Sequence, residues 1–216
     1  MPLQTTPAEA WQALREGNDR FIAGAMAHPS QDADRRADVS AGQQPFAVLL
    51  GCSDSRVAAE IIFDRGLGDL FVVRTAGHVT DATVLGSVEY GVAVLGVPLV
   101  VVLGHDLCGA IAATQDYLRT GTEPPGHIRS IVDRVRPGVA EHADRGPDEV
   151  LAGHVRYTVR ALLEDSVAVR TAVAEGRCAV IGATYRLAEG RVGVVAAHGP
   201  VDVPELEIAD NLDGSI

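Results

Sequence analysis

The sequence predicts an α/β fold: a central, mostly parallel sheet of four strands plus one antiparallel edge strand, with helices on both faces and an N-terminal helical arm. Short Val- and Leu-rich runs at 46–50 and 99–103 end at glycine, as buried parallel strands do. Segments with a helical spacing of apolar residues lie between such runs. The 216 residues are enough for one core, so we expect a single domain over 1–216.

The N-terminal arm and its linker occupy residues 1–44. Thr6 can cap a helix and Glu9 can complete a capping box, while Pro7 suits the first helical position. Trp11 falls on the apolar face of this helix. The arm could pack on a partner subunit or on its own domain, and the sequence leaves both open.

The remaining elements alternate along the chain. We expect strands at 46–50, 71–73, 99–103, 178–183 and 191–197. We expect helices at 57–63, 84–95 and 108–118, one from 128 that is broken at Pro137 and Gly138, and two more between 147 and 176. The last strand should be antiparallel, because only the tight turn 188–190 joins it to its predecessor. The acidic tail 199–216 should be flexible.

Composition excludes several classes of function. The formal charge of −11 argues against a nucleic-acid partner, which would need a basic face. The chain has no Lys, which excludes Schiff-base chemistry and a P-loop lysine. Its longest apolar stretch, 92–103, is too short to span a bilayer, and no secretory signal is visible at the start. Three cysteines cannot close a disulfide framework, so we expect a cytoplasmic protein.

Two thiols and one imidazole directly follow predicted strands. Cys52 follows the strand at 46–50, while His105 and Cys108 follow the strand at 99–103. Because ligands of open α/β sheets bind at the carboxyl ends of the strands, these side chains should meet. Cys108 also begins a helix, whose dipole favours the thiolate. Two Cys and one His form the ligand set of a catalytic zinc site with a fourth position open to water. The pattern therefore predicts a zinc enzyme.

A carboxylate and a guanidinium follow the first of these cysteines. Asp54 is close enough to accept the proton of a zinc-bound hydroxide, and also close enough to bind zinc and close the site. The planar guanidinium of Arg56 could pair with Asp54, and this pairing would determine whether Asp54 stays free or binds zinc. A lone Cys or His is usually structural, and Cys178 is assigned to the core. Asp106 is either a site residue or a plain turn residue.

With these residues in view, the sequence resembles the β-class carbonic anhydrases, in the plant-like subgroup. The motifs that carry the resemblance are 52–57, 71–74, 89–90 and 104–109. It implies zinc on Cys52, His105 and Cys108, with Asp54 and Arg56 as a gate. It also implies reversible hydration of carbon dioxide to bicarbonate by attack of zinc-bound hydroxide. The family's catalytic cleft lies at a subunit interface, which implies a homodimer or a dimer of dimers.

The resemblance also implies which residues bind substrate. Gln43 matches a glutamine that hydrogen-bonds substrate across the interface, and Phe71 and Tyr90 match positions on the apolar side of the cleft. Gly109, at a position where relatives have a glycine after the second zinc cysteine, completes this set.

Two positions set this chain apart from many relatives. Leu49 stands where members with an allosteric bicarbonate pocket carry tryptophan, so we predict no such pocket, although Arg74 and Tyr90 are present. His78 stands where relatives often have asparagine, and it could shuttle protons.

Three other functions compete with the hydratase. The same scaffold could hydrolyse carbon disulfide or carbonyl sulfide, or serve as a non-catalytic zinc or bicarbonate-binding module. The Asp54–Arg56 pair argues against the module, since a structural site needs no gate. A cysteine phosphatase would need five residues between Cys and Arg, and only three separate Cys52 from Arg56.

Overall fold

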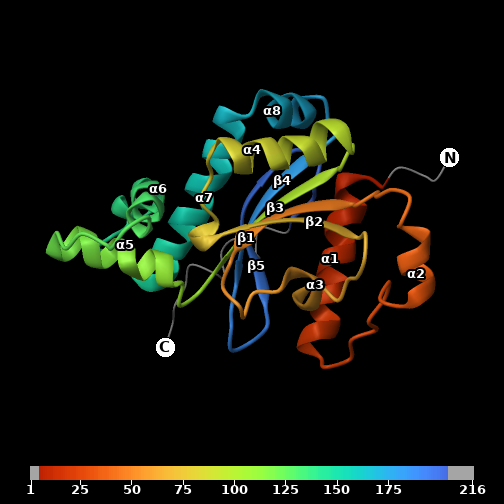
Figure 1. Cartoon of the computed structure of the whole chain (residues 1–216), viewed down its shortest axis with the longest axis horizontal. Helices are drawn as coiled ribbons and strands as arrows, with labels where there is room; N and C mark the ends of the chain where they lie inside the picture. Colours follow the sequence, from red (N-terminus) through yellow and green to blue (C-terminus); the bar gives the residue numbers. More distant parts are fainter. Residues whose placement is uncertain (1–4, 204–216) are drawn as a thin grey trace.

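The computed structural model describes residues 5–203, and their strands form one five-stranded sheet in the order β2-β1-β3-β4-β5. The strands are β1 (Ala47–Cys52), β2 (Leu70–Thr75), β3 (Leu99–His105), β4 (Ala179–Tyr185) and β5 (Val192–His198). β1 to β4 pair in parallel, and β5 is antiparallel to β4 (Figure 1). The predicted sheet, with its antiparallel edge strand, is confirmed.

Helices cover both faces of this sheet (Figure 1). They are α1 (Pro7–Ile22), α2 (Ala33–Asp38), α3 (Ala59–Ile62), α4 (Ala82–Glu89), α5 (Gly109–Thr120), α6 (Ile128–Ala140), α7 (Pro147–Asp165) and α8 (Val167–Ala174). Because side chains alternate along a strand, Val48 and Leu50 pack in one core while Ala47 and Leu49 pack in the other. The first core includes α4, α7 and α8, and the second includes α1 and α3.

The N-terminal arm packs its apolar face on its own chain, where Trp11 and Leu14 are buried. The expected capping box between Thr6 and Glu9 is present at the start of α1. A Cβ on Gly17 would lie 1.8 Å from the carbonyl oxygen of Phe63, so α1 touches the backbone at the end of α3. Asn18 donates to a main-chain carbonyl of the β4–β5 turn, at Gly190, 2.7 Å away.

Three local predictions need correction. The helix from 128 is not broken at Pro137, because α6 continues to Ala140. Its buried valines hold it against the core, and tertiary packing overrides the missing N–H of proline. A short helix, α2, lies in the stretch expected to be a linker, with the Asp32 side chain as its N-cap. The predicted helix 84–95 divides into α4 and a π-helical turn, Tyr90–Val94.

The predicted flexible tail 199–216 lies outside the described residues from 204 onward. Within residues 5–203, no helix combines the length and the apolar character that crossing a membrane would require.

Candidate metal centre

The three candidate ligands meet at the carboxyl edge of the sheet. Cys52 is the last residue of β1 and His105 is the last residue of β3, and these strands are parallel neighbours. Cys108 is the N-cap of α5. One ligand atom from each residue lies within 4.8 Å of the other two, and all three residues are buried. The arrangement could hold one metal ion.

The hydrogen bonds of His105 assign the roles of its two ring nitrogens. Nδ1 lies 2.7 Å from the carbonyl oxygen of Asp106, and because a carbonyl only accepts, Nδ1 carries the proton. Nε2 therefore keeps its lone pair, and it is buried with no hydrogen-bond partner among the described residues. A buried nitrogen lone pair beside two thiols is a position that a bound metal ion would satisfy.

The two thiols share one proton, so Cys52 is the thiolate of the pair. The pKa of Cys52 is lowered, chiefly by a hydrogen bond from the Cys108 thiol and also by the N–H of Gly77, 3.3 Å from its sulfur. The pKa of Cys108 is raised, because its proton is shared with Cys52. Neither forms a disulfide. Two sulfurs and one imidazole nitrogen in a buried cluster are a donor set that fits zinc.

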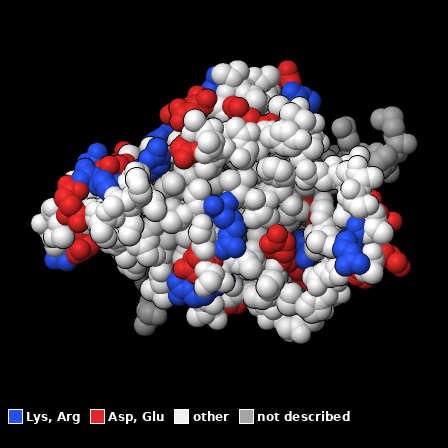
Figure 2. Space-filling model, viewed as in Figure 1, with Lys and Arg blue, Asp and Glu red and all other residues white. Residues whose placement is uncertain are grey.

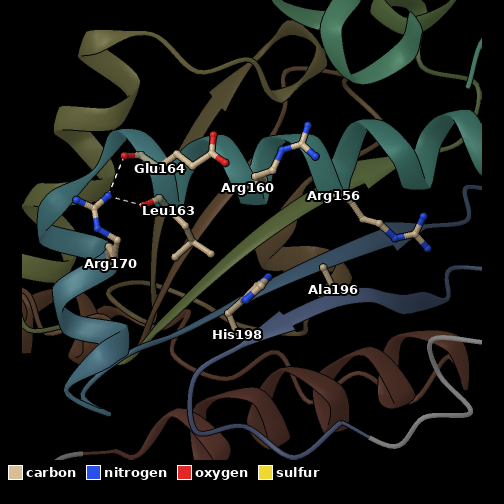
Figure 3. Close-up of a pocket in the computed structure, with 7 residues that line it drawn as sticks. All are labelled: Arg156, Arg160, Leu163, Glu164, Arg170, Ala196 and His198. Atoms are coloured by element: carbon tan, nitrogen blue, oxygen red, sulfur yellow. Dashed lines mark hydrogen bonds between the residues drawn. The ribbon is translucent and has the colours of Figure 1, made fainter. Parts of the chain in front are cut away.

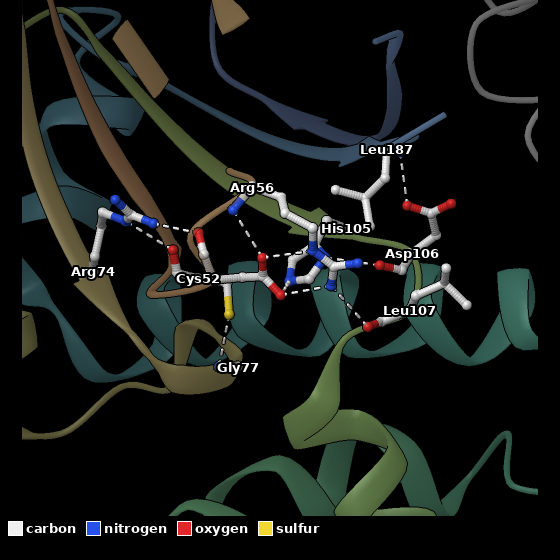
Figure 4. A network of polar contacts seen from close by, with 9 residues as sticks. Cys52, Arg56, Arg74, Gly77, His105, Asp106, Leu107 and Leu187 are labelled. Carbon is white, nitrogen blue, oxygen red and sulfur yellow. Dashed lines mark hydrogen bonds and ion pairs between the residues drawn. The ribbon is translucent and has the colours of Figure 1, made fainter. Parts of the chain in front are cut away.

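Asp54 and Arg56 form a forked ion pair beside the cluster. Nε of Arg56 lies 2.9 Å from Oδ1 of Asp54, and Nη2 lies 2.7 Å from Oδ2 (Figure 4). These hydrogen bonds hold the pKa of Asp54 far below its usual range, so the carboxylate is ionised. Oδ2 of Asp54 is 3.9 Å from Nε2 of His105. The carboxylate thus stands next to the ligands and is restrained by the arginine.

The expected substrate residues do not converge on the cluster within one chain. The rings of Phe71 and Tyr90 stack at 6.1 Å. Phe71 pairs with Val48, four residues before Cys52, which is about 13 Å along the strand. Gln43 is exposed in the loop before β1. Only Gly109, the first residue of α5, adjoins a ligand.

Comparison with known proteins identifies the family. The sequence model of the family described as carbonic anhydrase matches residues 47–192. The chain belongs to the carbonic anhydrase family. It is 55% identical over 190 residues to "Carbonic anhydrase 2" of Mycobacterium tuberculosis (strain CDC 1551 / Oshkosh), covering 87% of this chain and 92% of that protein. It is 54% identical over 200 residues to "Carbonic anhydrase" of Mycolicibacterium smegmatis, covering 91% and 97%.

Solved β-carbonic anhydrases share the fold. A tetrameric β-carbonic anhydrase of Sordaria macrospora superimposes with a TM-score of 0.69 at 24% identity, covering 84% of this chain and 95% of that one. The Coccomyxa β-carbonic anhydrase, in complex with acetazolamide, gives a TM-score of 0.66 at 25% identity, covering 88% and 86%. The carbonic anhydrase described here therefore has the fold of the β class.

Three hydrogen bonds near the metal centre of this carbonic anhydrase have no signal in a single sequence. Arg74 donates from Nε to the carbonyl of Cys52 at 2.8 Å, and from Nη2 to the carbonyl of Asp54 at 2.6 Å (Figure 4). It thereby fixes the loop that carries the ion pair. Asp106 accepts from the N–H of Leu187 at 2.9 Å, so its carboxylate ties the turn to the segment after β4.

Two histidines differ from the sequence-based expectation. His78, considered as a proton shuttle, is fully buried, and burial lowers its pKa well below the ordinary value. A ring without solvent access cannot exchange protons with water, so the shuttle hypothesis is wrong for this chain. No motif surrounds His154, so the sequence alone would place it on a helix surface, but it is 1% exposed.

A separate groove lies between α7, α8 and β5 (Figure 3). It has a volume of about 670 Å³ and is lined by Arg156, Arg160, Leu163, Glu164, Arg170, Ala196 and His198. His198 pairs with Val180 near the start of β4, whereas the ligands follow the carboxyl ends of parallel strands. The groove contains none of the candidate ligands, and we assign it no part in the chemistry.

Proposed function

We propose that the protein catalyses the reversible hydration of carbon dioxide to bicarbonate and a proton, with zinc held by Cys52, His105 and Cys108. One observation carries the proposal: the three donor atoms lie within 4.8 Å of one another, and the lone pair of His105 Nε2 has no other partner among the described residues. Membership of the carbonic anhydrase family supports the reaction.

The residues around the ligands suit this chemistry. Bound zinc supplies Lewis acidity, which makes water nucleophilic near neutral pH. The ionised Oδ2 of Asp54, 3.9 Å from His105 Nε2, would accept a hydrogen bond from a water molecule at this site and so orient it toward carbon dioxide. Arg56 keeps Asp54 in this role by holding both carboxylate oxygens. Because two thiolates donate charge to the metal, we expect turnover to rise on the alkaline side.

We propose a homodimer or a dimer of dimers in which Gln43, Phe71, Tyr90 and Gly109 complete the substrate pocket. The distance of Phe71 from Cys52 along the sheet supports a pocket shared between subunits. Leu107, between two ligands, is 78% exposed, which is unusual for a leucine beside a functional site. On the face in Figure 2, wide areas without Lys, Arg, Asp or Glu lie between the charged groups, and depletion of charged residues is typical of the core of a subunit interface.

A cytoplasmic location is part of the proposal. Cys52, Cys108 and Cys178 are all free and buried, which suits a reducing compartment.

Stopped-flow measurement of carbon dioxide hydration from pH 7 to 9, with zinc measured on the same samples, tests the function. Cys52→Ala should lose both zinc and activity, because one ligand is missing. Cys178→Ala is the matched control, since Cys178 is equally buried but outside the cluster, and it should keep both. Equal activity of the two variants would contradict the proposal.

The same samples separate the competing functions. Faster hydrolysis of carbon disulfide or carbonyl sulfide than hydration of carbon dioxide would indicate the sister activity. Bound zinc with no turnover at pH 8.5 would indicate a non-catalytic binding module, which the Asp54–Arg56 ion pair disfavours.

A further inference from the structure

The sulfur of Cys52 accepts a hydrogen bond from a turn with an unusual backbone. Gly77 donates its N–H to Cys52 Sγ at 3.3 Å (Figure 4). Gly77 has φ 68° and the following His78 has φ 42°, so two successive residues adopt the left-handed conformation. This conformation disfavours a side chain at His78. The turn that brings an N–H to the sulfur is therefore strained and must be held by other contacts.

His154, on α7, provides such a contact. Its Nε2 lies 2.9 Å from the carbonyl oxygen of Gly77. Burial lowers the pKa of His154, so its imidazole is neutral and carries one N–H. Nδ1 is buried without a partner among the described residues, and a carbonyl cannot donate, so the proton lies on Nε2. His154 thus donates a hydrogen bond to the residue that donates to Cys52.

The surrounding side chains leave the ring of His154 little freedom. The ring of His78 lies against it, with centroids 4.4 Å apart, and neither nitrogen of His78 has a partner among the described residues. On α6, Gly138 leaves room for the ring, because a Cβ there would lie 2.7 Å from Nδ1 of His154. The ring is therefore enclosed by packing, and its polar contact is directed to Gly77.

We infer that His154 is a positioning residue for the metal ligand Cys52: it holds the carbonyl of Gly77 and so keeps the N–H of Gly77 on the sulfur. The inference rests on the proposed metal centre. A hydrogen bond to a thiolate stabilises its charged form, and groups that orient metal ligands in this way typically contribute 10- to 100-fold to metal affinity.

The test compares His154→Met with His154→Gln, side chains of equal length of which only glutamine carries an N–H donor. Thr158→Val is the control, because Thr158 donates to the backbone carbonyl of His154 at 3.0 Å and leaves the ring contact intact. Each protein is loaded with cobalt(II). The dissociation constant is measured by competition with a chelator, and the sulfur-to-cobalt charge-transfer band is recorded.

We expect His154→Met to bind cobalt about 10- to 100-fold more weakly and to shift the band to lower energy, since the sulfur loses its hydrogen bond. His154→Gln should restore most of both, and Thr158→Val should match the wild type. An unchanged constant and band in His154→Met would overturn the inference, as would equal losses in His154→Met and Thr158→Val. Absence of cobalt binding by the wild type would instead overturn the proposed metal centre.

A measurement on the wild type covers the case in which His154→Met does not fold. ¹⁵N chemical shifts of the His154 ring between pH 6 and 8 should report a neutral ring protonated at Nε2. A ring protonated at Nδ1 would overturn the inference, because Nε2 could not then donate to Gly77.

Discussion

Replacing Gly104 with alanine tests how tightly α7 supports the ligand that follows. Gly104 immediately precedes His105 in β3. A Cβ at this position would lie 2.5 Å from Cγ2 of Val155 and 2.9 Å from Cδ1 of Leu151, both on α7, whereas ordinary contacts begin at 3.4 Å. Therefore the side chains of Val155 and Leu151, the strand or the helix must shift by about 1 Å. Overpacking of this kind costs about 1–3 kcal/mol of unfolding free energy.

The same movement should reduce activity. Where the strand gives way, a shift of β3 at Gly104 displaces His105 relative to Cys52 on the neighbouring strand. Misplacing a reacting group by about 1 Å can lower the rate about 100-fold. We therefore expect kcat/KM of Gly104→Ala to fall about 10- to 100-fold, together with weaker retention of zinc.

Denaturant unfolding at a fixed protein concentration, zinc content and stopped-flow hydration measure these effects. Gly86→Ala is the matched control, because a Cβ on this α4 glycine would meet nothing within 4 Å. It should stabilise the protein by about 0.5–1 kcal/mol, since alanine is the better helix former, and should leave activity unchanged. Wild-type stability and activity in Gly104→Ala would refute the close packing of α7 on β3.

Three further predictions concern the gate, acid stability and regulation. Arg56→Gln should release Asp54 toward His105, 3.9 Å away, and lower kcat/KM about 100-fold while zinc is retained; wild-type turnover would contradict the gate. Burial opposes ionisation of Asp64, but two backbone N–H groups and Arg20 hold its pKa below the ordinary 3.8. The stabilisation by ionised Asp64 is thus present above about pH 4 and is lost as the pH falls through the pKa of the folded state. In Asp64→Asn, the free energy of unfolding should therefore depend less on pH between pH 5 and 2. An unchanged pH dependence, measured by urea unfolding, would refute this. Inhibition by bicarbonate should be hyperbolic, and a sigmoidal curve would reveal an allosteric pocket.

Much of the fold was predictable because its three central strands, β1, β3 and β4, are fully buried. Runs such as Leu99–Leu103 leave no polar position, and parallel strands of this kind carry a strong local signal. The same regularity predicted that Cys52 and His105 would meet, because both follow strands whose carboxyl ends share one edge.

Contacts that depend on distant packing were not predictable. Pro137 reads locally as a helix breaker, yet α6 continues through it, because the buried face of the helix packs on the core. No sequence motif surrounds His154 in α7. Its contact with Gly77 spans 77 residues, and only the tertiary structure brings the two together.

X-ray absorption spectroscopy of the purified protein at the zinc edge tests the central claim most directly. The account predicts one zinc per chain with two sulfur ligands at about 2.3 Å and the remaining nitrogen or oxygen ligands at about 2.0–2.2 Å. Absence of zinc, or a disulfide between Cys52 and Cys108, would contradict it.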